Sequence, residues 1–364
     1  MATDTDRLTL AITDLVPKLL TAMEAFEQVQ RNAAPGNYPD LVSFLSPFAQ
    51  ELQEARNAFA SLEFPDELKP FGDQIAHAAE YSTRACDSIA HYEEGMGRVM
   101  QAMRAQCRAQ EFAYPLAAVL SPVSKYFLEH PARDNAGLLD SFARAADTDQ
   151  TGLMHADNAR DKRGGFTLYV PENLATDEPL SVVVALHGGT GHGADFIWSW
   201  LREARTRGFI VLAPTSQQDT WSLMGEEHDM PALLAMLNYV KTNWQVDEEH
   251  ILLTGMSDGG TYSLLAGLRE NSPFTHLAPF SGVLHPEISM TGDIRHASGR
   301  RIYLVHGTQD WMFPIETAYM AVDELERAGA ALTFREVKGL SHTYARSENP
   351  ALIEWFNPRL KIPT

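Results

Sequence analysis

The spacing of hydrophobic residues changes once along this chain of 364 residues. Up to about residue 150, apolar side chains recur every three or four positions, which places them on one face of a helix. The first such stripe comprises Leu8, Ile12, Leu15, Leu19, Met23 and Phe26. Proline or glycine interrupts the spacing near residues 35, 65 and 131, where helices are expected to end. Residues 1–150 are therefore predicted to form an all-α domain, a bundle of about four or five helices.

From about residue 166 the pattern becomes one of short, wholly apolar runs that alternate with helical segments. The runs predicted to be strands cover residues 166–170, 182–186, 209–213, 251–253, 277–280, 302–305 and 334–337. Such an alternation is typical of a mostly parallel sheet with flanking helices on both faces. We expect an α/β domain over residues 151–364, with ligands bound at the carboxyl ends of its strands.

Composition and charge narrow the classes of function. The formal net charge of -19 argues against a nucleic-acid partner, because binding to phosphates needs clustered lysines and arginines. No apolar run approaches the roughly 18 residues that a membrane helix requires, and the N-terminus is acidic where a signal peptide would be basic. The only two cysteines, Cys86 and Cys107, lie on helical stripes and are read as reduced, structural thiols. We therefore expect a cytoplasmic protein without a membrane span.

A candidate nucleophile follows the strand predicted at residues 251–253. Residues 255–259 read Gly-Met-Ser-Asp-Gly and precede a helical segment. The pattern Gly-x-Ser-x-Gly between strand and helix is the nucleophile elbow, a turn so tight that side chains flanking the serine would clash. The same string also occurs by chance, and its serine could simply cap an ordinary helix. The strand before it and the helix after it favour Ser257 as a nucleophile.

Two further residues complete a Ser-His-Asp arrangement. Asp310 follows the run at 302–305, and His342 follows the run at 334–337. The chain order Ser, Asp, His is the order that the elbow-bearing fold requires. Taken singly, the aspartate could be a turn residue and the histidine a loop residue. Together they predict that His342 accepts the proton of Ser257 while Asp310 orients the imidazole.

A glycine-rich loop supplies candidate oxyanion donors. Residues 187–193 read His-Gly-Gly-Thr-Gly-His-Gly and follow the run at 182–186. In this position glycines let backbone N–H groups approach an acyl oxygen, so Gly189 and Asp258 are the predicted donors, with Thr190 as the alternate to the first. No Gly-Lys-Ser/Thr follows, and no third metal ligand stands at a suitable spacing from the two histidines. We therefore expect no cofactor and no metal.

Three large side chains are candidates for the walls of a substrate pocket. Trp221 and Met224 lie in the segment after the run at 209–213, and Trp311 is the neighbour of the proposed acid. They are predicted to contact substrate, because ligand pockets are lined mainly by apolar and aromatic side chains. For the first two, a surface loop that packs on the edge of the sheet is the alternative.

With these residues in place, residues 166–356 resemble the phospholipase/carboxylesterase family of α/β-hydrolases, which includes the acyl-protein thioesterases. The resemblance rests on Leu-His-Gly-Gly at 186–189, Gly-Met-Ser-Asp-Gly-Gly at 255–260, Phe-Ser-Gly-Val-Leu at 280–284, His-Gly-Thr-Gln-Asp at 306–310 and Gly-Leu-Ser-His at 339–342. The chain departs from the family at Asp258, where glutamine is frequent, and in its long helical region. Dienelactone hydrolases share the layout but use a cysteine nucleophile, which Ser257 excludes.

The expected function is that of a serine carboxylesterase, which hydrolyses small-molecule esters through an acyl-enzyme intermediate. An acyl thioesterase, which differs only in its leaving group, is one alternative, and a non-catalytic scaffold of the same fold is another. The sequence leaves open whether the chain forms a homo-oligomer. The helical domain is expected to pack on the hydrolase and to border its pocket without supplying a catalytic group.

Overall fold

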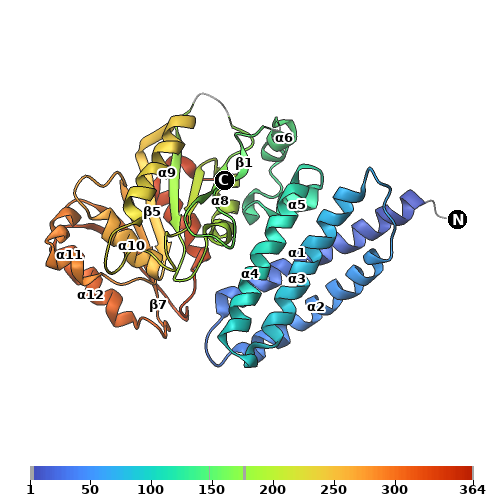
Figure 1. Ribbon diagram of the computed structural model, residues 1–364, viewed down its shortest axis with the longest axis horizontal. Coiled ribbons are helices and arrows are strands. Elements are labelled where there is room, and N and C mark those ends of the chain that lie inside the picture. Colours follow the sequence, from blue (N-terminus) through green and yellow to red (C-terminus); the bar gives the residue numbers. More distant parts are fainter. Residues whose placement is uncertain (1–3, 147, 175–177, 363–364) are drawn as a thin grey trace. The chain divides into compact units, whose positions relative to one another are not determined.

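A computed structural model describes residues 4–146, 148–174 and 178–362. The chain divides into two compact units, Met1–Ala143 and Arg144–Thr364, a few residues before the domain boundary expected from the sequence. The first unit is helical and the second contains the sheet (Figure 1). Within the described residues, no helix has both the length and the apolar character needed to cross a membrane.

The first unit is built on four long helices, which lie side by side in Figure 1. They are α1 (Asp4–Asn32), α2 (Tyr38–Ala60), α3 (Lys69–Ala90) and α4 (Met96–Ala113), followed by the shorter α5 (Ser121–Tyr126) and α6 (Ala136–Arg144). The stripes predicted from the sequence form its core, where Phe26 of α1 packs with Leu45 of α2 and Ile89 of α3. Alanines such as Ala102 on the inner face of α4 let the helices approach closely. The all-α bundle is confirmed.

The second unit is organised around one eight-stranded sheet. In chain order its strands are β1 (Gly152–Ala156), β2 (Phe166–Val170), β3 (Leu180–Leu186), β4 (Ile210–Pro214), β5 (Val246–Met256), β6 (His276–Phe280), β7 (Arg301–Gly307) and β8 (Ala331–Val337). Their order in the sheet is β1-β2-β4-β3-β5-β6-β7-β8. The pairs β1–β2 and β2–β4 are antiparallel, and every other neighbouring pair is parallel. The predicted α/β class is thus confirmed, with β1 as a strand that the sequence pattern did not indicate.

Helices flank the sheet, as Figure 1 shows for α8, α9, α10 and α12. The helices of this unit are α7 (Gly193–Phe196), α8 (Leu201–Arg207), α9 (Asp229–Asn243), α10 (Asp258–Gly267), α11 (Pro286–Met290), α12 (Ile315–Arg327) and α13 (Asn349–Phe356). The central strand β3 and the part of β5 from Ile251 to Leu253 consist of mainly buried apolar residues because helices cover both faces of the sheet there. Since β3, β5, β6, β7 and β8 run parallel, the loops that follow them emerge at the same edge of the sheet.

Candidate active site

The turn from β5 into α10 holds Ser257 in a strained conformation. The serine has φ 57° and ψ −118°, and its N–H donates to the carbonyl of Phe280 on β6 at 2.9 Å. A Cβ on Gly255 would lie 2.5 Å from the backbone of Gly259, and a Cβ on Gly259 would lie 2.5 Å from the carbonyl oxygen of Leu186. Both glycines are therefore required by sterics, as in a nucleophile elbow. The turn leaves the serine at the start of α10, where the helix N-terminus carries a partial positive charge.

Three side chains from three strand ends form one hydrogen-bonded line. The Oγ of Ser257 lies 3.0 Å from Nε2 of His342, in the loop after β8. The Nδ1 of the same imidazole lies 2.8 Å and 3.0 Å from the two carboxylate oxygens of Asp310, after β7. These distances are within hydrogen-bonding range for both partners of the histidine. The structure thus brings together the three residues that the sequence placed at separate strand ends.

The loop after β7 fixes the carboxylate of Asp310. Its Oδ1 accepts the backbone N–H groups of Met312 at 3.0 Å and Phe313 at 2.8 Å. Burial would raise the pKa of this carboxyl group, but the hydrogen bond from His342, the backbone N–H of Phe313 and the nearby imidazole of His306 outweigh that effect. The pKa of Asp310 is consequently lowered, so the group stays ionised and can stabilise an imidazolium on His342.

The glycine-rich loop after β3 approaches the elbow directly. A Cβ on Gly188 would lie 3.6 Å from the Cβ of Ser257, and a Cβ on Gly189 would lie 2.7 Å from the carboxylate of Asp258. The N–H of Thr190 is already engaged, because it donates to the carbonyl of Asp219 at 2.9 Å. This bond disfavours Thr190, the alternate oxyanion donor, and leaves Gly189 and the first residue of α10, Asp258, as the predicted pair.

The side chain of His187 stabilises the same loop. It is buried, its Nε2 accepts the N–H of Ser216 at 3.1 Å, and its Nδ1 lies 2.6 Å from the carbonyl oxygen of Gly188. Burial, reinforced by the positive charge of Arg163, lowers the pKa of this imidazole to about 3. The ring is therefore neutral, and its contacts assign the proton to Nδ1. These contacts show that His187 stabilises the loop through hydrogen bonds.

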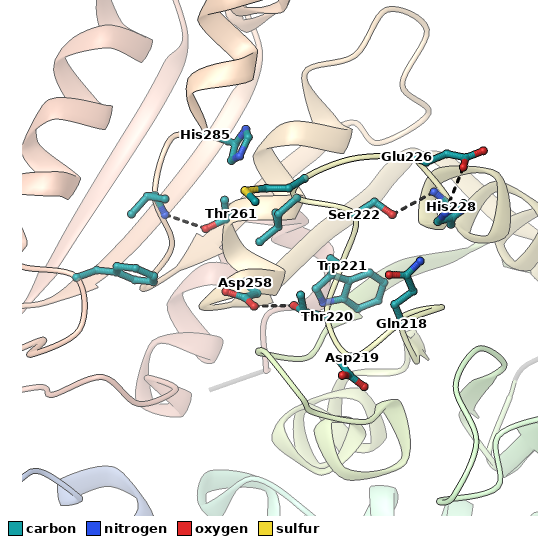
Figure 2. Close-up of a pocket in the computed structure, with 14 residues that line it drawn as sticks. Gln218, Asp219, Thr220, Trp221, Ser222, Glu226, His228, Asp258, Thr261 and His285 are labelled. Carbon is teal, nitrogen blue, oxygen red and sulfur yellow. Dashed lines mark hydrogen bonds and ion pairs between the residues drawn. The ribbon is translucent and has the colours of Figure 1, made fainter.

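A cavity of about 860 Å³ opens beside the elbow. Figure 2 shows Thr220 and Asp258 side by side, where the hydroxyl of Thr220 donates to the carboxylate of Asp258 at 2.6 Å, with His285 and Glu226 elsewhere around the cavity. The lining residues are Gln218, Asp219, Thr220, Trp221, Ser222, Leu223, Met224, Glu226, His228, Asp258, Thr261, Val283, His285 and Phe313. Three of them are carboxylates, and none of these lining residues is a lysine or an arginine. The cavity next to the candidate nucleophile thus combines apolar side chains with an acidic wall.

The three predicted pocket residues occupy different environments. Met224 lines the cavity with 87% of its surface exposed. Trp221 also borders the cavity but is buried, since its ring stacks on that of Tyr262 and lies tilted against the imidazole of His187. Its Nε1 donates to the carbonyl of His187 at 2.7 Å. Trp311 is half exposed, and its ring centre lies 6.3 Å from that of His342. Contact of these three side chains with substrate stays a prediction.

Among the described residues, no group of three or more His, Cys, Asp or Glu side chains is arranged to hold a metal ion. The side chain of His192 instead caps α7, where its Nδ1 accepts the N–H of Ala194 at 3.2 Å. Cys86 is buried, and burial raises the pKa of its thiol to about 12. The side chains of Ser257, His342 and Asp310 are hydrogen-bonded to one another at the strand ends.

Comparison with known proteins supports the resemblance inferred from the motifs. Residues 230–357 match the sequence model of the phospholipase/carboxylesterase family. This segment, about a third of the chain, is similar to that family. It contains Ser257, Asp310 and His342, whereas the loop after β3 lies outside the matched range.

Two curated proteins that are similar to part of this chain are esterases by name. A bifunctional acetylxylan esterase/xylanase from Neocallimastix patriciarum is 27% identical over 148 residues, which cover 39% of this chain and 21% of that protein. Feruloyl esterase B from Neurospora crassa is 28% identical over 132 residues, 32% of this chain and 43% of that protein. The match therefore spans less than half of either relative.

Among solved structures, an acetyl xylan esterase from Aspergillus awamori has a TM-score of 0.46 and 18% identity, over 56% of this chain and 98% of that one.

Proposed function

We propose that this protein is a serine carboxylesterase that cleaves carboxylic esters through an acyl-enzyme intermediate on Ser257. The observation that supports the proposal most strongly is the continuous hydrogen-bonded line from Ser257 through His342 to Asp310. A serine that merely capped α10 would need neither the strained backbone nor a histidine within 3.0 Å of its Oγ. The family match and the names of both curated relatives point to the same class of reaction.

The first half of the reaction forms the acyl-enzyme. The Oγ of Ser257 attacks the ester carbonyl carbon while Nε2 of His342 takes the hydroxyl proton, and the carboxylate of Asp310 stabilises the resulting imidazolium. The carbonyl oxygen becomes an oxyanion, which accepts hydrogen bonds from the N–H groups of Gly189 and Asp258. When the tetrahedral intermediate collapses, the bond to the alkoxy oxygen breaks and His342 returns the proton to the leaving alcohol.

The second half releases the acid. A water molecule takes the place of the alcohol, loses a proton to Nε2 of His342 and attacks the acyl carbon. Collapse of the second tetrahedral intermediate breaks the bond to Oγ, and the proton passes from His342 back to Ser257. The products are one carboxylic acid and one alcohol, and the three side chains return to their starting protonation states.

The experiment that tests the proposal replaces Ser257 with alanine. We expect Ser257→Ala to lower kcat/KM on a small activated ester by about a thousandfold or more, and to abolish labelling by a fluorophosphonate probe, without loss of folded protein. Ser341→Ala is the matched control, because that serine precedes His342 but its buried hydroxyl has no hydrogen-bond partner in the described structure. Retention of more than a tenth of the activity by Ser257→Ala would refute the assignment.

A further inference from the structure

The segment between β1 and β2 does more than connect two strands. Residues 157–165 are polar and turn back sharply at Gly164 and Gly165, with φ values of 78° and 69°. A Cβ on Gly165 would lie 2.4 Å from the carbonyl oxygen of Asp157, so the turn depends on glycine there. Backbone hydrogen bonds of 3.1 Å from Gly164 to Ser216, and of 3.0 Å from Thr215 to Gly165, fasten the segment beside the loop after β4. This placement brings the preceding residue, Arg163, to the carboxyl edge of the sheet.

The guanidinium of Arg163 bridges two loops of the candidate active site. Its Nη1 donates to the carbonyl of Gly191 at 2.6 Å, and its Nε donates to the carbonyl of Gln218 at 2.8 Å. Its Nη2 donates to the hydroxyl of Ser216 and lies 3.5 Å from Nε2 of His187. The first contact belongs to the loop after β3 and the next two to the loop after β4. One side chain therefore satisfies acceptors on both loops at once.

The contacts of Arg163 are linked to the proposed oxyanion donor through a short turn. The N–H of Gly191 donates to the carbonyl of Gly188 at 3.0 Å, which closes a turn with Gly189 at its second position. The neighbouring Thr190 N–H is bonded to the loop after β4 through Asp219. A displacement of Gly191 would therefore rotate the peptide that carries the N–H of Gly189. A change of about 1 Å at such a donor is enough to slow a reaction by about a hundredfold.

We propose that Arg163 is a positioning residue that holds the Gly188–Gly191 turn so that the Gly189 N–H is aimed at the oxyanion. The proposal rests on the proposed esterase function. Arginine suits this task because its planar fork presents several donors in fixed directions, whereas lysine offers a single ammonium on a flexible stem. Arg163 acts on the Gly189 N–H through its hydrogen bond to the carbonyl of Gly191, so its own side chain need not touch the substrate.

The test compares Arg163→Gln and Arg163→Lys with Lys162→Gln. Lys162 is the matched control, since it carries the same charge one position earlier and is exposed. We expect both Arg163 variants to lower kcat by about ten- to a hundredfold, with KM changed less than about threefold, because loss of a whole oxyanion donor costs about 10² to 10³ in kcat. The affinity for a trifluoromethyl ketone, which forms a tetrahedral oxyanion adduct with serine, should weaken by the same factor as kcat/KM. Addition of guanidinium ions should restore part of the activity of Arg163→Ala.

A second measurement separates this proposal from the esterase assignment. Hydrogen–deuterium exchange of the peptide that covers residues 187–193 should accelerate in Arg163→Gln and remain at the wild-type rate in Lys162→Gln, whether or not an active substrate is known. Unchanged exchange in Arg163→Gln would overturn the positioning role. A kcat within threefold of wild type in both Arg163 variants would also overturn it. If the wild-type protein hydrolysed no ester, but exchange at residues 187–193 accelerated in Arg163→Gln and not in Lys162→Gln, the esterase function alone would be refuted.

Discussion

Mild acid should destabilise the sheet-containing unit because two of its histidines are buried in the neutral form. Burial lowers the pKa of His187 to about 3, with the positive charge of Arg163 adding to the effect. Burial likewise lowers the pKa of His276 to about 3, reinforced by Arg301. In the unfolded chain each imidazole has its ordinary pKa of about 6.5. Between these values the unfolded state binds more protons than the folded state, so stability falls as the pH falls from about 6.5 towards about 3.

Over most of this range the folded imidazole stays neutral, so the loss of stability depends only on how far the pH lies below the pKa of the unfolded histidine. At pH 5, about 1.5 units below that pKa, protonation stabilises the unfolded state by about 2 kcal/mol per histidine. His187 and His276 together should then remove about 4 kcal/mol between pH 8 and pH 5. That is a large part of the roughly 5 to 15 kcal/mol that ordinarily stabilises a domain.

The assay is urea unfolding at pH 8 and pH 5, followed by tryptophan fluorescence. All six tryptophans lie after residue 150, so the signal reports only on the sheet-containing unit. We expect His187→Gln to reduce the loss of unfolding free energy between the two pH values by about 2 kcal/mol, since glutamine does not titrate. His228→Gln is the control, because its side chain is partly exposed at 39%. The same pH-dependent loss in His187→Gln and in wild type would refute the reasoning.

Two further predictions concern activity. Asp310→Asn should lower kcat/KM by about a thousandfold or more because it removes the charge that stabilises the imidazolium. Asp293→Asn, in the short 3-10 helix before β7, should change kcat/KM less than about threefold. Equal losses would show that the acid was wrongly chosen. Asp258→Asn should raise kcat/KM for an ester with an anionic alcohol group by about three- to tenfold, relative to a neutral ester with the same acyl group. This factor is the repulsion removed when the carboxylate and the anionic group lie about 6 Å apart at an effective dielectric constant of about 40 to 80. An unchanged ratio at low ionic strength would mean that the acidic wall does not face the alcohol group.

The fold was predictable where local pattern and tertiary environment agree. The central strands are buried on both faces, so they appear in the sequence as unbroken apolar runs such as Val182–Leu186. Strand β1 lies at the edge of the sheet and pairs on one side only, so it needs no apolar run. Its Gly-Leu-Met-His-Ala sequence carries neither alternation nor β-branched residues. Such a strand is fixed by its pairing with β2, which a local pattern does not record.

The candidate site shows the same division. Ser257, Asp310 and His342 could be proposed because each immediately follows a recognisable strand, and parallel strands bring such positions to one edge. The side chain of Trp221 could not be placed, because whether it faces a cavity or the interior depends on its stacking with Tyr262. Arg163 was missed for a related reason. Its partners lie 24 to 56 positions away in the sequence, so the segment around it had the composition of an ordinary polar connection.

Two parts of the candidate site are held in place by different contacts: the elbow with the acid loop, and the loops after β3 and β4. This difference affects how the substrate specificity of the site can change. The elbow and the acid loop are fixed by backbone hydrogen bonds and by glycines that sterics require, so most substitutions there would displace the reacting groups. The loops after β3 and β4 are joined largely through side chains, chiefly Arg163, His187 and Trp221. Replacing those side chains leaves the backbone of the elbow and its contacts with β6 intact. Substitutions in the loops after β3 and β4 can therefore alter the pocket wall and the direction of the Gly189 N–H while the nucleophile and its histidine keep their geometry.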